Sequence, residues 1–358
     1  MKNTCSLRDG LLLVMSLLTL AACNQPQSEG QSADSQPASK ILQPKYITES
    51  LPNDSDDPAI WVNPDNPGES LIIGTDKSGP DGGLYVFDLK GKIVNSVTGL
   101  NRPNNVDLAY GMVAGGDTFA IAVTSERLNG QMRAFRVPEM APVDGGGMPV
   151  FEGEPSDEVM GIALYSRVSD GAIFAIVSHK TEDGDPVDSA ALFQYRLVGQ
   201  ADGTVKAEYV RRFGIYSGVK EIEAIAADDE RGLVYFSDEG VGVRQYYADP
   251  DSPNVQLKLF ATAGFAEDHE GISIYPTGAE TGYITVSDQG AQRFHIFDRI
   301  TQDELGIVDV AALESDGSES VADSLNADFP AGLFVAMSDD RTFHLYDWRD
   351  ILSAFVQE

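Results

Sequence analysis

Cysteine and histidine are both scarce in this 358-residue sequence, and their scarcity excludes several kinds of chemistry. The two cysteines, Cys5 and Cys23, stand near the start of the chain, so the remainder can hold neither a disulfide nor a cysteine nucleophile. The four histidines form no His-x-x-x-His pair and no Arg-His-Gly segment, which argues against a histidine nucleophile. No Gly-x-Ser-x-Gly sequence occurs, so a serine on a nucleophile elbow is not expected.

Basic residues are also few relative to acidic ones. The chain has 25 Lys and Arg against 56 Asp and Glu, which gives a formal net charge of −31. Such a surface repels nucleic acid and anionic lipid and attracts divalent cations. An alternative is that the acidity only keeps an exported protein soluble.

The first 22 residues are typical of a lipoprotein signal peptide. Lys2 and Arg8 precede an apolar run from residue 11 to residue 22, too short to span a bilayer as a helix. The run ends in Leu20-Ala21-Ala22-Cys23, which resembles a lipobox, so we expect cleavage before Cys23 and lipidation of that cysteine. The alternative is an ordinary signal with an incidental cysteine. Asn24 is not the Asp that retains lipoproteins at the inner membrane, which favours the outer membrane.

A linker and one large domain follow the signal. Residues 23–45 are rich in Gln, Ser, Pro, Ala and Asp and predict a disordered tether between the lipid and the domain. The lipid would be the chain's contact with the membrane. Residues 46–358 are too many for one simple core but fit a single repeat domain, which we expect to be monomeric.

A repeat of about 50 residues indicates the fold class. A strand ending in an aromatic residue recurs six times, and the spacings between these aromatics are 48, 60, 51, 51 and 49. The aromatics are Phe87, Phe135, Tyr195, Tyr246, Phe297 and Tyr346. Short β-rich runs separated by Gly, Asp, Asn and Pro turns surround them, so the sequence predicts an all-β, six-bladed β-propeller of four-stranded antiparallel blades.

An apolar strand precedes each aromatic strand and ends near a small hydroxyl residue. These runs, such as Leu71–Gly74 and Leu333–Ala336, are expected near the interior of the propeller, covered on both faces by neighbouring blades. The segment Tyr46–Thr48 is a candidate for the strand that closes the ring.

Equivalent positions in a repeat lie at equivalent heights on a ring, so the polar residues that follow these strands are informative. In order they are Lys77, Arg127, Lys180, Glu239, Gln289 and Asp340. A second set precedes or begins the neighbouring strand: Asp56, Asp57, Asp107, Glu158, Glu223, Asp268, Glu270 and Asp316. If both sets open on one face, that face has a cationic side and an acidic side.

Such a face suits a phosphorylated substrate. Lys and Arg neutralise phosphate, carboxylate clusters bind calcium, and a bound metal can polarise phosphate and activate water. The alternative is that turn-rich proteins place Asp and Lys at strand ends in any case.

Two segments resemble the signature motifs of the β-propeller phytases, in particular the lipoprotein form of the bacterial 3-phytases. They are Asp56-Asp57-Pro58-Ala59-Ile60-Trp61-Val62 and Asn104-Asn105-Val106-Asp107-Leu108-Ala109-Tyr110. Further similar segments follow in order around Glu223, Glu239, Asp268-His269-Glu270-Gly271 and Ser315-Asp316-Gly317. The resemblance covers roughly residues 46–348.

The resemblance implies a calcium-dependent enzyme that removes phosphate from phytate, myo-inositol hexakisphosphate, presented as its calcium complex. Lys77 and Arg127 would neutralise the cleaved phosphate, Lys180 would hold a neighbouring one, and Glu239 would position or deprotonate the attacking water. The implied calcium ligands are Asp56, Asp57, Asn105, Asp107, Glu223, Asp268, Glu270 and Asp316. The implied catalytic residues are Lys77, Arg127, Glu223 and Glu239.

Met160 departs from this pattern, because the family usually has a phosphate-binding tyrosine there. Two other interpretations remain open. One is a lactonase or diesterase on a similar calcium propeller, although a neutral lactone does not need three cations. The other is a non-catalytic, calcium-stabilised propeller that binds a partner at the cell envelope.

Overall fold

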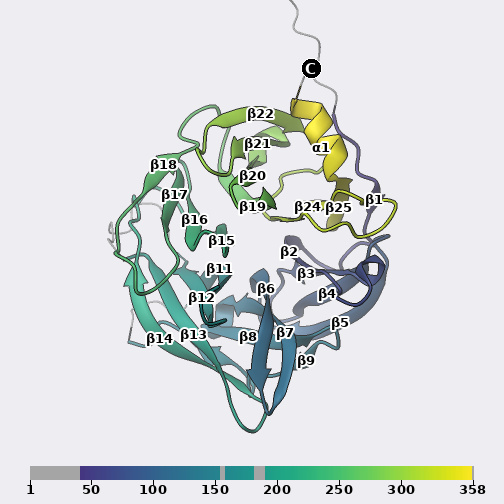
Figure 1. The fold of residues 1–358 in the computed structure, drawn as a ribbon. Helices are drawn as coiled ribbons and strands as arrows, with labels where there is room; N and C mark the ends of the chain where they lie inside the picture. Colours follow the sequence, from purple (N-terminus) through teal and green to yellow (C-terminus); the bar gives the residue numbers. More distant parts are fainter. Residues whose placement is uncertain (1–40, 154–157, 181–189, 357–358) are drawn as a thin grey trace, which may run out of the picture. The chain divides into compact units, whose positions relative to one another are not determined.

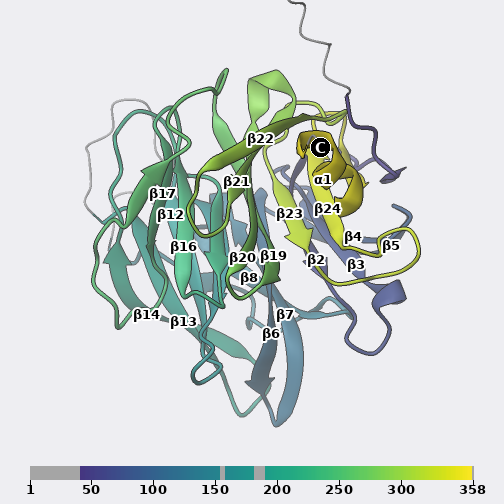
Figure 2. The same cartoon turned by 45° about the horizontal axis from the view of Figure 1, so that its top comes forward.

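The computed structural model describes residues 41–153, 158–180 and 190–356, which lie within one compact unit. In it, six antiparallel sheets follow one another around a common centre, so the predicted six-bladed propeller is confirmed (Figures 1 and 2). Within the blades the strands run in chain order from the centre outward, except that β1 forms the outer strand of the last blade.

The first three blades contain the thirteen strands β2 to β14. Blade 1 consists of β2 (Ser55–Trp61), β3 (Leu71–Asp76), β4 (Gly82–Asp88) and β5 (Ile93–Leu100). Blade 2 consists of β6 (Pro103–Ala114), β7 (Asp117–Glu126), β8 (Gln131–Val137) and an outer position shared by β9 (Ala141–Pro142) and β10 (Met148–Pro149). Blade 3 consists of β11 (Val159–Ser166), β12 (Ile173–His179), β13 (Leu192–Gly199) and β14 (Val205–Phe213).

The other three blades repeat this plan. Blade 4 consists of β15 (Ile225–Asp228), β16 (Leu233–Asp238), β17 (Gly242–Tyr247) and β18 (Lys258–Phe260). Blade 5 consists of β19 (His269–Gly278), β20 (Thr281–Asp288), β21 (Arg293–Asp298) and β22 (Glu304–Asp309). Blade 6 consists of β23 (Ser318–Val321), β24 (Leu333–Ser338), β25 (Thr342–Asp347) and β1 (Tyr46–Ile47). Short 3₁₀ helices η1 (Pro67–Glu69), η2 (Arg127–Asn129) and η3 (Gln289–Ala291) and one α-helix, α1 (Trp348–Phe355), complete the described elements.

The ring is closed by the start of the domain, as the sequence predicted. Strand β1 pairs antiparallel with β25, with Tyr46 opposite Leu345 and Ile47 opposite His344. The Thr48 amide donates to the Phe343 carbonyl at 3.0 Å, which extends the pairing. The last blade therefore combines strands from both ends of the domain, which are joined by main-chain hydrogen bonds.

The core lies between the blades. Six hydrophobic clusters each combine side chains of two neighbouring blades. Strand β24 shows why: Val335 and Met337 enter the cluster shared with blade 1, whereas Phe334 and Ala336 enter the cluster shared with blade 5. Successive side chains of a strand point to opposite faces, so an apolar run buries itself against both neighbours. The apolar strands are thus the second strands of the blades, one place outside the centre.

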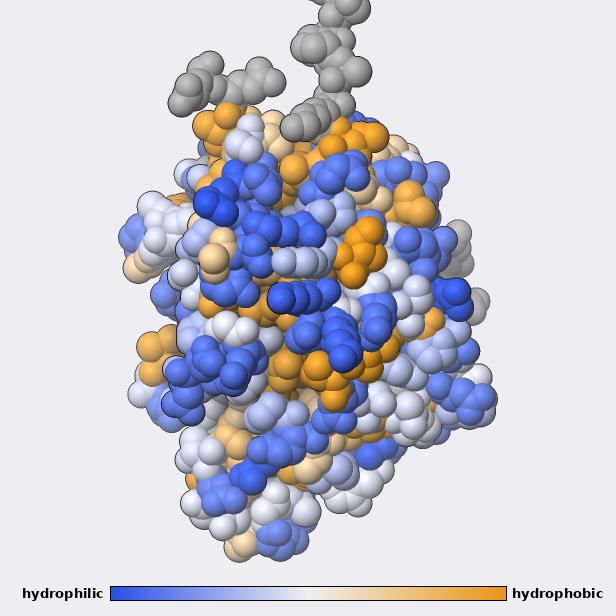
Figure 3. All heavy atoms as spheres, turned by 90° about the vertical axis from the view of Figure 1, so that its right-hand side faces the viewer, coloured by the Kyte–Doolittle hydropathy of each residue, from blue (hydrophilic) through white to orange (hydrophobic). Residues whose placement is uncertain are grey.

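The aromatic residues that revealed the repeat lie in the third strands β4, β8, β13, β17, β21 and β25, and all six are buried. Each occupies one of the clusters between blades. The flank carrying the outer strands of blades 1 and 6 is largely hydrophilic, with separate hydrophobic areas (Figure 3).

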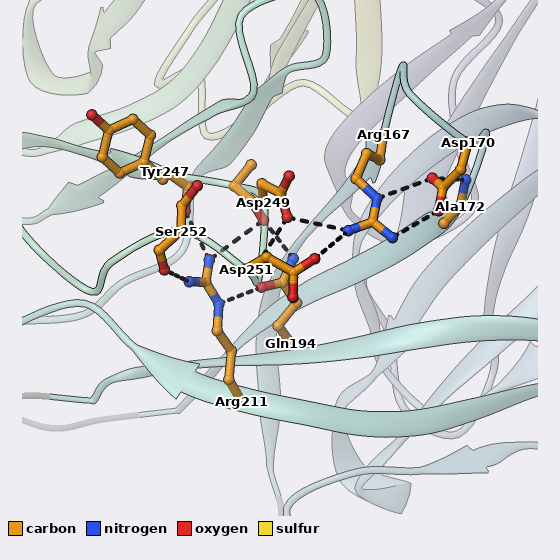
Figure 4. Close-up of polar contacts among 10 residues, drawn as sticks. Arg167, Asp170, Ala172, Gln194, Arg211, Tyr247, Asp249, Asp251 and Ser252 are labelled. Carbon is orange, nitrogen blue, oxygen red and sulfur yellow. Dashed lines mark hydrogen bonds and ion pairs between the residues drawn. The ribbon is translucent and has the colours of Figure 1, made fainter.

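A polar network also joins blades 3 and 4 (Figure 4). Arg167 bonds Asp170 of its own blade at 2.7 Å and Asp251 of the next at 2.9 Å. The hydrogen bonds and charge of Arg167 hold the pKa of Asp170 at about 2. Arg211 makes a parallel link, through hydrogen bonds to Gln194, Tyr247 and Ser252. Since every carboxylate drawn here faces an arginine or a main-chain donor, this network serves blade-to-blade contact.

Candidate active site

A β-bulge near the start of the innermost strand presents side chains at the same place in several blades. The register shifts between Ser55 and Pro58 in β2, and corresponding shifts occur in β6, β11 and β19. The paired residues inside these bulges are Asp56-Asp57, Asn104-Asn105, Met160-Gly161 and Glu270-Gly271. Bulges re-aim side chains at functional sites, and here they gather the residues of both signature motifs.

Glu223-Ala224 and Asp316-Gly317 hold the same place in blades 4 and 6. The Ser237 amide donates to the Ala224 carbonyl at 3.0 Å, and the Met337 amide donates to the Gly317 carbonyl at 2.9 Å. Both donors are the fifth residue of their blade's second strand. All six blades therefore deliver one bulge-position residue to one end of the ring.

Hydroxyl side chains and glycines support these bulges. An amide freed by a bulge must find another acceptor, and Thr75, Ser125 and Ser178 accept from Asp57, Asn105 and Gly161 at 2.9, 3.1 and 3.0 Å. This explains the small hydroxyl residues that follow the apolar strands. A Cβ on Gly161 would lie 1.9 Å from the Glu223 carbonyl oxygen, so a glycine is required for Glu223 to approach.

Three carboxylates converge at the centre of this end. Glu223, Glu239 and Glu270 each offer an oxygen, and these oxygens all lie within 4.8 Å of one another. Glu270 is 6% exposed and Glu239 is 5% exposed. Burial, together with the charges of Glu223 and Asp268, raises the pKa of Glu239 to about 8. Burial and the neighbouring carboxylates also raise the pKa of Glu270 well above its usual range.

Lys77 links this trio to two further acids. Its Nζ forms an ion pair with Asp56 and lies 3.3 Å from Oδ2 of Asp316. Burial alone would lower the pKa of Lys77, but the charges of Asp56, Glu223 and Asp316 outweigh it, so the pKa is raised. Burial raises the pKa of Asp316 to about 6 despite that ammonium. Lys77 is therefore permanently charged beside the trio.

The other two expected cations are also paired. Arg127 Nε lies 3.1 Å from Glu158 Oε2, and Lys180 forms an ion pair with Glu221. Each of the three cations thus has a carboxylate partner, because a partly buried ammonium or guanidinium is costly unless paired. Asp340 does not join the group and accepts from Thr342 in the turn between β24 and β25.

The structure directs Asp57 and Asp107 elsewhere. Both line a cavity of about 750 Å³ bounded by the six innermost strands, together with Asp229 and Glu319. Asp57 Oδ2 accepts from the Val106 amide at 3.0 Å, and Asp107 Oδ2 accepts from the Leu164 amide at 2.6 Å. Each of these acids thus binds the main chain of the next blade. Burial raises the pKa of Asp107 to about 6 and that of Glu319 to about 8.

Asn104 and Asn105 have different hydrogen-bond partners. The resemblance implied Asn105 as a calcium ligand, whereas the residue that contacts the trio is the fully buried Asn104, whose Nδ2 donates to Glu223 Oε1. The same Nδ2 lies 3.1 Å from Asn105 Oδ1. Asn104 stands in the quoted motif at the position equivalent to Asp56, so comparison of the repeats could have identified it.

Asp268 has a partner that the sequence analysis did not consider. Lys220 Nζ lies 2.7 Å from each of its carboxylate oxygens. Lys220 is outside the repeat positions, in the segment between β14 and β15. No periodic signal marks it.

Met160 occupies the bulge position of blade 3 and is 1% exposed. Its thioether cannot donate the hydrogen bond that a tyrosine would give to a phosphate. Cys23 and residues 1–40 lie outside the described residues. Within the described ranges, no helix has the length and apolar character needed to cross a membrane.

The donor set fits a hard divalent cation. Buried Glu239 Oε1 and Glu270 Oε2 have no hydrogen-bond partner within the described part of the chain. Orphaned, buried carboxylate oxygens are costly, whereas calcium binds such oxygens at ordinary ligand counts. Glu223, Glu239 and Glu270 would hold the ion, with Asp56, Asp268 and Asp316 adjacent.

Fold and site together define a β-propeller with a cluster of carboxylates and paired cations at one end of the ring. The model of the phytase family matches residues 11–345, so the chain belongs to this family and is a phytase enzyme that acts on phytate. It is similar to a protein described as 3-phytase from Bacillus subtilis (strain 168). The two are 28% identical over 324 residues, which cover 83% of this chain and 80% of that protein.

Proposed function

We propose that this phytase is calcium-dependent and releases phosphate from calcium phytate by direct attack of water. The observation that carries the proposal is the trio Glu223, Glu239 and Glu270, whose oxygens lie within 4.8 Å of one another beside permanently charged Lys77. Three carboxylates this close repel one another unless a cation or protons compensate them. Calcium held there would stabilise negative charge on the phosphate and lower the pKa of a water.

The protein's own groups account for substrate binding. Lys77 and Arg127 would bind the phosphate that is cleaved, Arg127 with the forked geometry that suits phosphate oxygens. Lys180 would hold a neighbouring phosphate. In this structure each of these cations forms an ion pair with a carboxylate: Asp56, Glu158 or Glu221. A bound phosphate would take the place of that carboxylate.

Proton transfer falls to Glu239. The buried Oε1 of Glu239 has no hydrogen-bond partner in the described part of the chain and can therefore accept a hydrogen bond from a water. Glu239 would orient the attacking water and accept its proton. Developing charge on the transferred phosphoryl group would be stabilised by Lys77 and Arg127, without a covalent intermediate.

Asp57, Asn105 and Asp107 have a different part in this proposal. Asp57 and Asp107 lie in the central cavity and bind the main chain of neighbouring blades, so they would hold the blades in register behind the site. Asn105 orders the bulge through Ser125.

The proposal includes export, lipidation at Cys23 and attachment to the outer membrane, on the strength of the sequence Leu20-Ala21-Ala22-Cys23. The domain would act as a monomer on soluble phytate. Incorporation of labelled palmitate, and its loss in Cys23→Ala, tests the anchor.

Phosphate release from calcium phytate by residues 24–358, with and without a chelator, tests the activity. We expect release near neutral pH that the chelator abolishes and that calcium restores. Lys77→Ala should abolish it in a folded protein. A folded domain that binds calcium yet releases no phosphate would favour a non-catalytic envelope propeller, and Met160 would be the first position to change.

A further inference from the structure

Lys220 is a fourth cation at the site, held in place by its own loop. Its main-chain carbonyl accepts from Tyr216, which is 2% exposed. In the same loop, Ser217 Oγ donates to Asp238 Oδ1 at 2.6 Å. These bonds fix the main chain three residues before Glu223, while the side chain of Lys220 is 43% exposed.

The ammonium of Lys220 binds the carboxylate of Asp268, whose charge acts on two members of the trio. It lies 2.7 Å from both oxygens of Asp268, whose side chain is 16% exposed. The charge of Asp268 reaches Glu239 and Glu270, where it raises both pKa values, and the charge of Lys220 lowers that of Glu239. Lys220 and Asp268 thus belong to the same electrostatic neighbourhood as Glu239.

The Lys220 contact and a divalent ion compete for Asp268. A carboxylate whose two oxygens both accept from one ammonium has fewer lone pairs to offer a metal, and two cations on one carboxylate repel each other. A metal that used Asp268 would therefore compete with the ammonium of Lys220 for this carboxylate. The side chain of Lys220 is half-exposed and has a flexible four-carbon stem, so its ammonium can move toward Lys180. Lys180 pairs with Glu221, which follows Lys220 in the chain.

We infer that Lys220 is a substrate-binding residue that exchanges partners: it pairs with Asp268 in the metal-free protein and binds a substrate phosphate beside Lys180 once a divalent ion takes Asp268. The inference rests on the proposed calcium-dependent function. Lys220 thus competes with the metal for Asp268 before the metal binds, and contacts the substrate afterwards.

Two titrations of the full domain test this exchange, neither of which measures turnover. The first follows binding of calcium alone by calorimetry. The second follows binding of myo-inositol hexasulfate, a non-hydrolysable polyanion, to the calcium-loaded protein. The variants are Lys220→Met, Lys220→Gln and charge-retaining Lys220→Arg, and the matched control is Lys206→Met, at an exposed lysine of β14.

In Lys220→Met and Lys220→Gln we expect calcium affinity to rise about fivefold, because a partly exposed ion pair contributes about 1 kcal/mol. We expect hexasulfate affinity to fall by about the same factor. Lys220→Arg and Lys206→Met should match the original protein in both titrations. Unchanged or weaker calcium binding in Lys220→Met overturns the inference, as does unchanged hexasulfate binding. An equal gain in Lys206→Met also overturns it, since the effect would then be one of net charge.

Failure of the proposed function gives a different pattern. If the original protein released no phosphate but Lys220→Met still bound calcium more tightly and hexasulfate more weakly, the exchange would stand without the activity. If the original protein were active and Lys220→Met bound both ligands as before, only this inference would fall.

Discussion

Asp56 and Asp57 are neighbours in the chain but serve different parts of the molecule. Asp56 forms an ion pair with Lys77 at the carboxylate site, whereas Asp57 accepts from the Val106 amide in the central cavity. The bulge in β2 separates them: Asp56 is buried and Asp57 half-buried, and loss of solvent raises the pKa of both. One dipeptide therefore supplies both the chemistry of the site and a contact that fixes the next blade.

Loss of one carboxylate of the trio should weaken metal binding and catalysis together. In Glu270→Gln we expect calcium affinity to fall roughly 10- to 100-fold and phosphate release by about 100-fold or more, because an amide oxygen replaces a charged ligand. Calorimetry and phosphate release measure the two effects. Glu208→Gln, on exposed β14, is the matched control and should change neither. If Glu270→Gln kept its calcium affinity, the trio would not be the metal site.

The metal-free protein should lose stability as the pH rises. Glu239 and Glu319 have pKa values of about 8 in the folded protein, against an ordinary value of 4.5. Between these values the folded state binds more protons than the unfolded state, so the stabilisation is complete below about pH 4.5 and is lost through pH 8. We expect the Tm in a chelator to fall from pH 5 to pH 8 by several degrees.

Calcium should reverse part of this trend, because metal binding favours the deprotonated carboxylates and releases protons. The Tm should therefore fall less with pH in calcium, and the apparent heat of binding should depend on the ionisation enthalpy of the buffer. Identical pH profiles with calcium and with chelator would contradict the assignment.

Asn104 should act by positioning Glu223. Asn104→Leu keeps the approximate volume but removes the donor to Glu223 Oε1. We expect phosphate release to fall about 10- to 100-fold and calcium affinity to fall with it, while the far-UV circular dichroism is unchanged. Asn95→Leu, at an exposed position of β5, is the control. A loss of folding without a change in calcium affinity per folded molecule would mean that Asn104 is only structural.

The closing strand should govern stability without touching the site. Removal of residues 1–50 deletes β1 and its hydrogen bonds, among them Lys45 N to Leu345 O at 2.7 Å and Thr48 N to Phe343 O at 3.0 Å. At roughly 1 kcal/mol for each of these two main-chain bonds alone, we expect the free energy of unfolding to fall by at least about 2 kcal/mol. Removal of residues 1–40, which retains β1, should cost nothing. Urea unfolding of the two shortened chains compares them directly.

The ring was predictable from the sequence because each blade repeats the same burial problem. A strand covered on both faces must be apolar throughout, and an aromatic residue fills the space between blades, so Leu333–Ala336 and Tyr346 stand out without a structure. The closing segment Tyr46–Thr48 could be proposed because a ring must end beside its beginning.

The site was less accessible to such reasoning. A side chain changes face with every residue, so the sequence Asp56-Asp57 cannot say which carboxylate meets Lys77 until the bulge is known. The ion pairs Arg127–Glu158 and Lys180–Glu221 depend on how neighbouring blades meet, which the repeat does not show. Lys220 comes from a loop whose course no period describes.

The bulges also give the molecule a modular character. The same place in the six blades is occupied by Asp56, Asn104, Met160, Glu223, Glu270 and Asp316, and in the first three blades a hydroxyl of the second strand accepts from the bulge amide. The residue at that place can therefore be exchanged in one blade while the other five keep theirs. The ligand set of such a ring can therefore change one blade at a time, and Met160 is the one apolar side chain among these six.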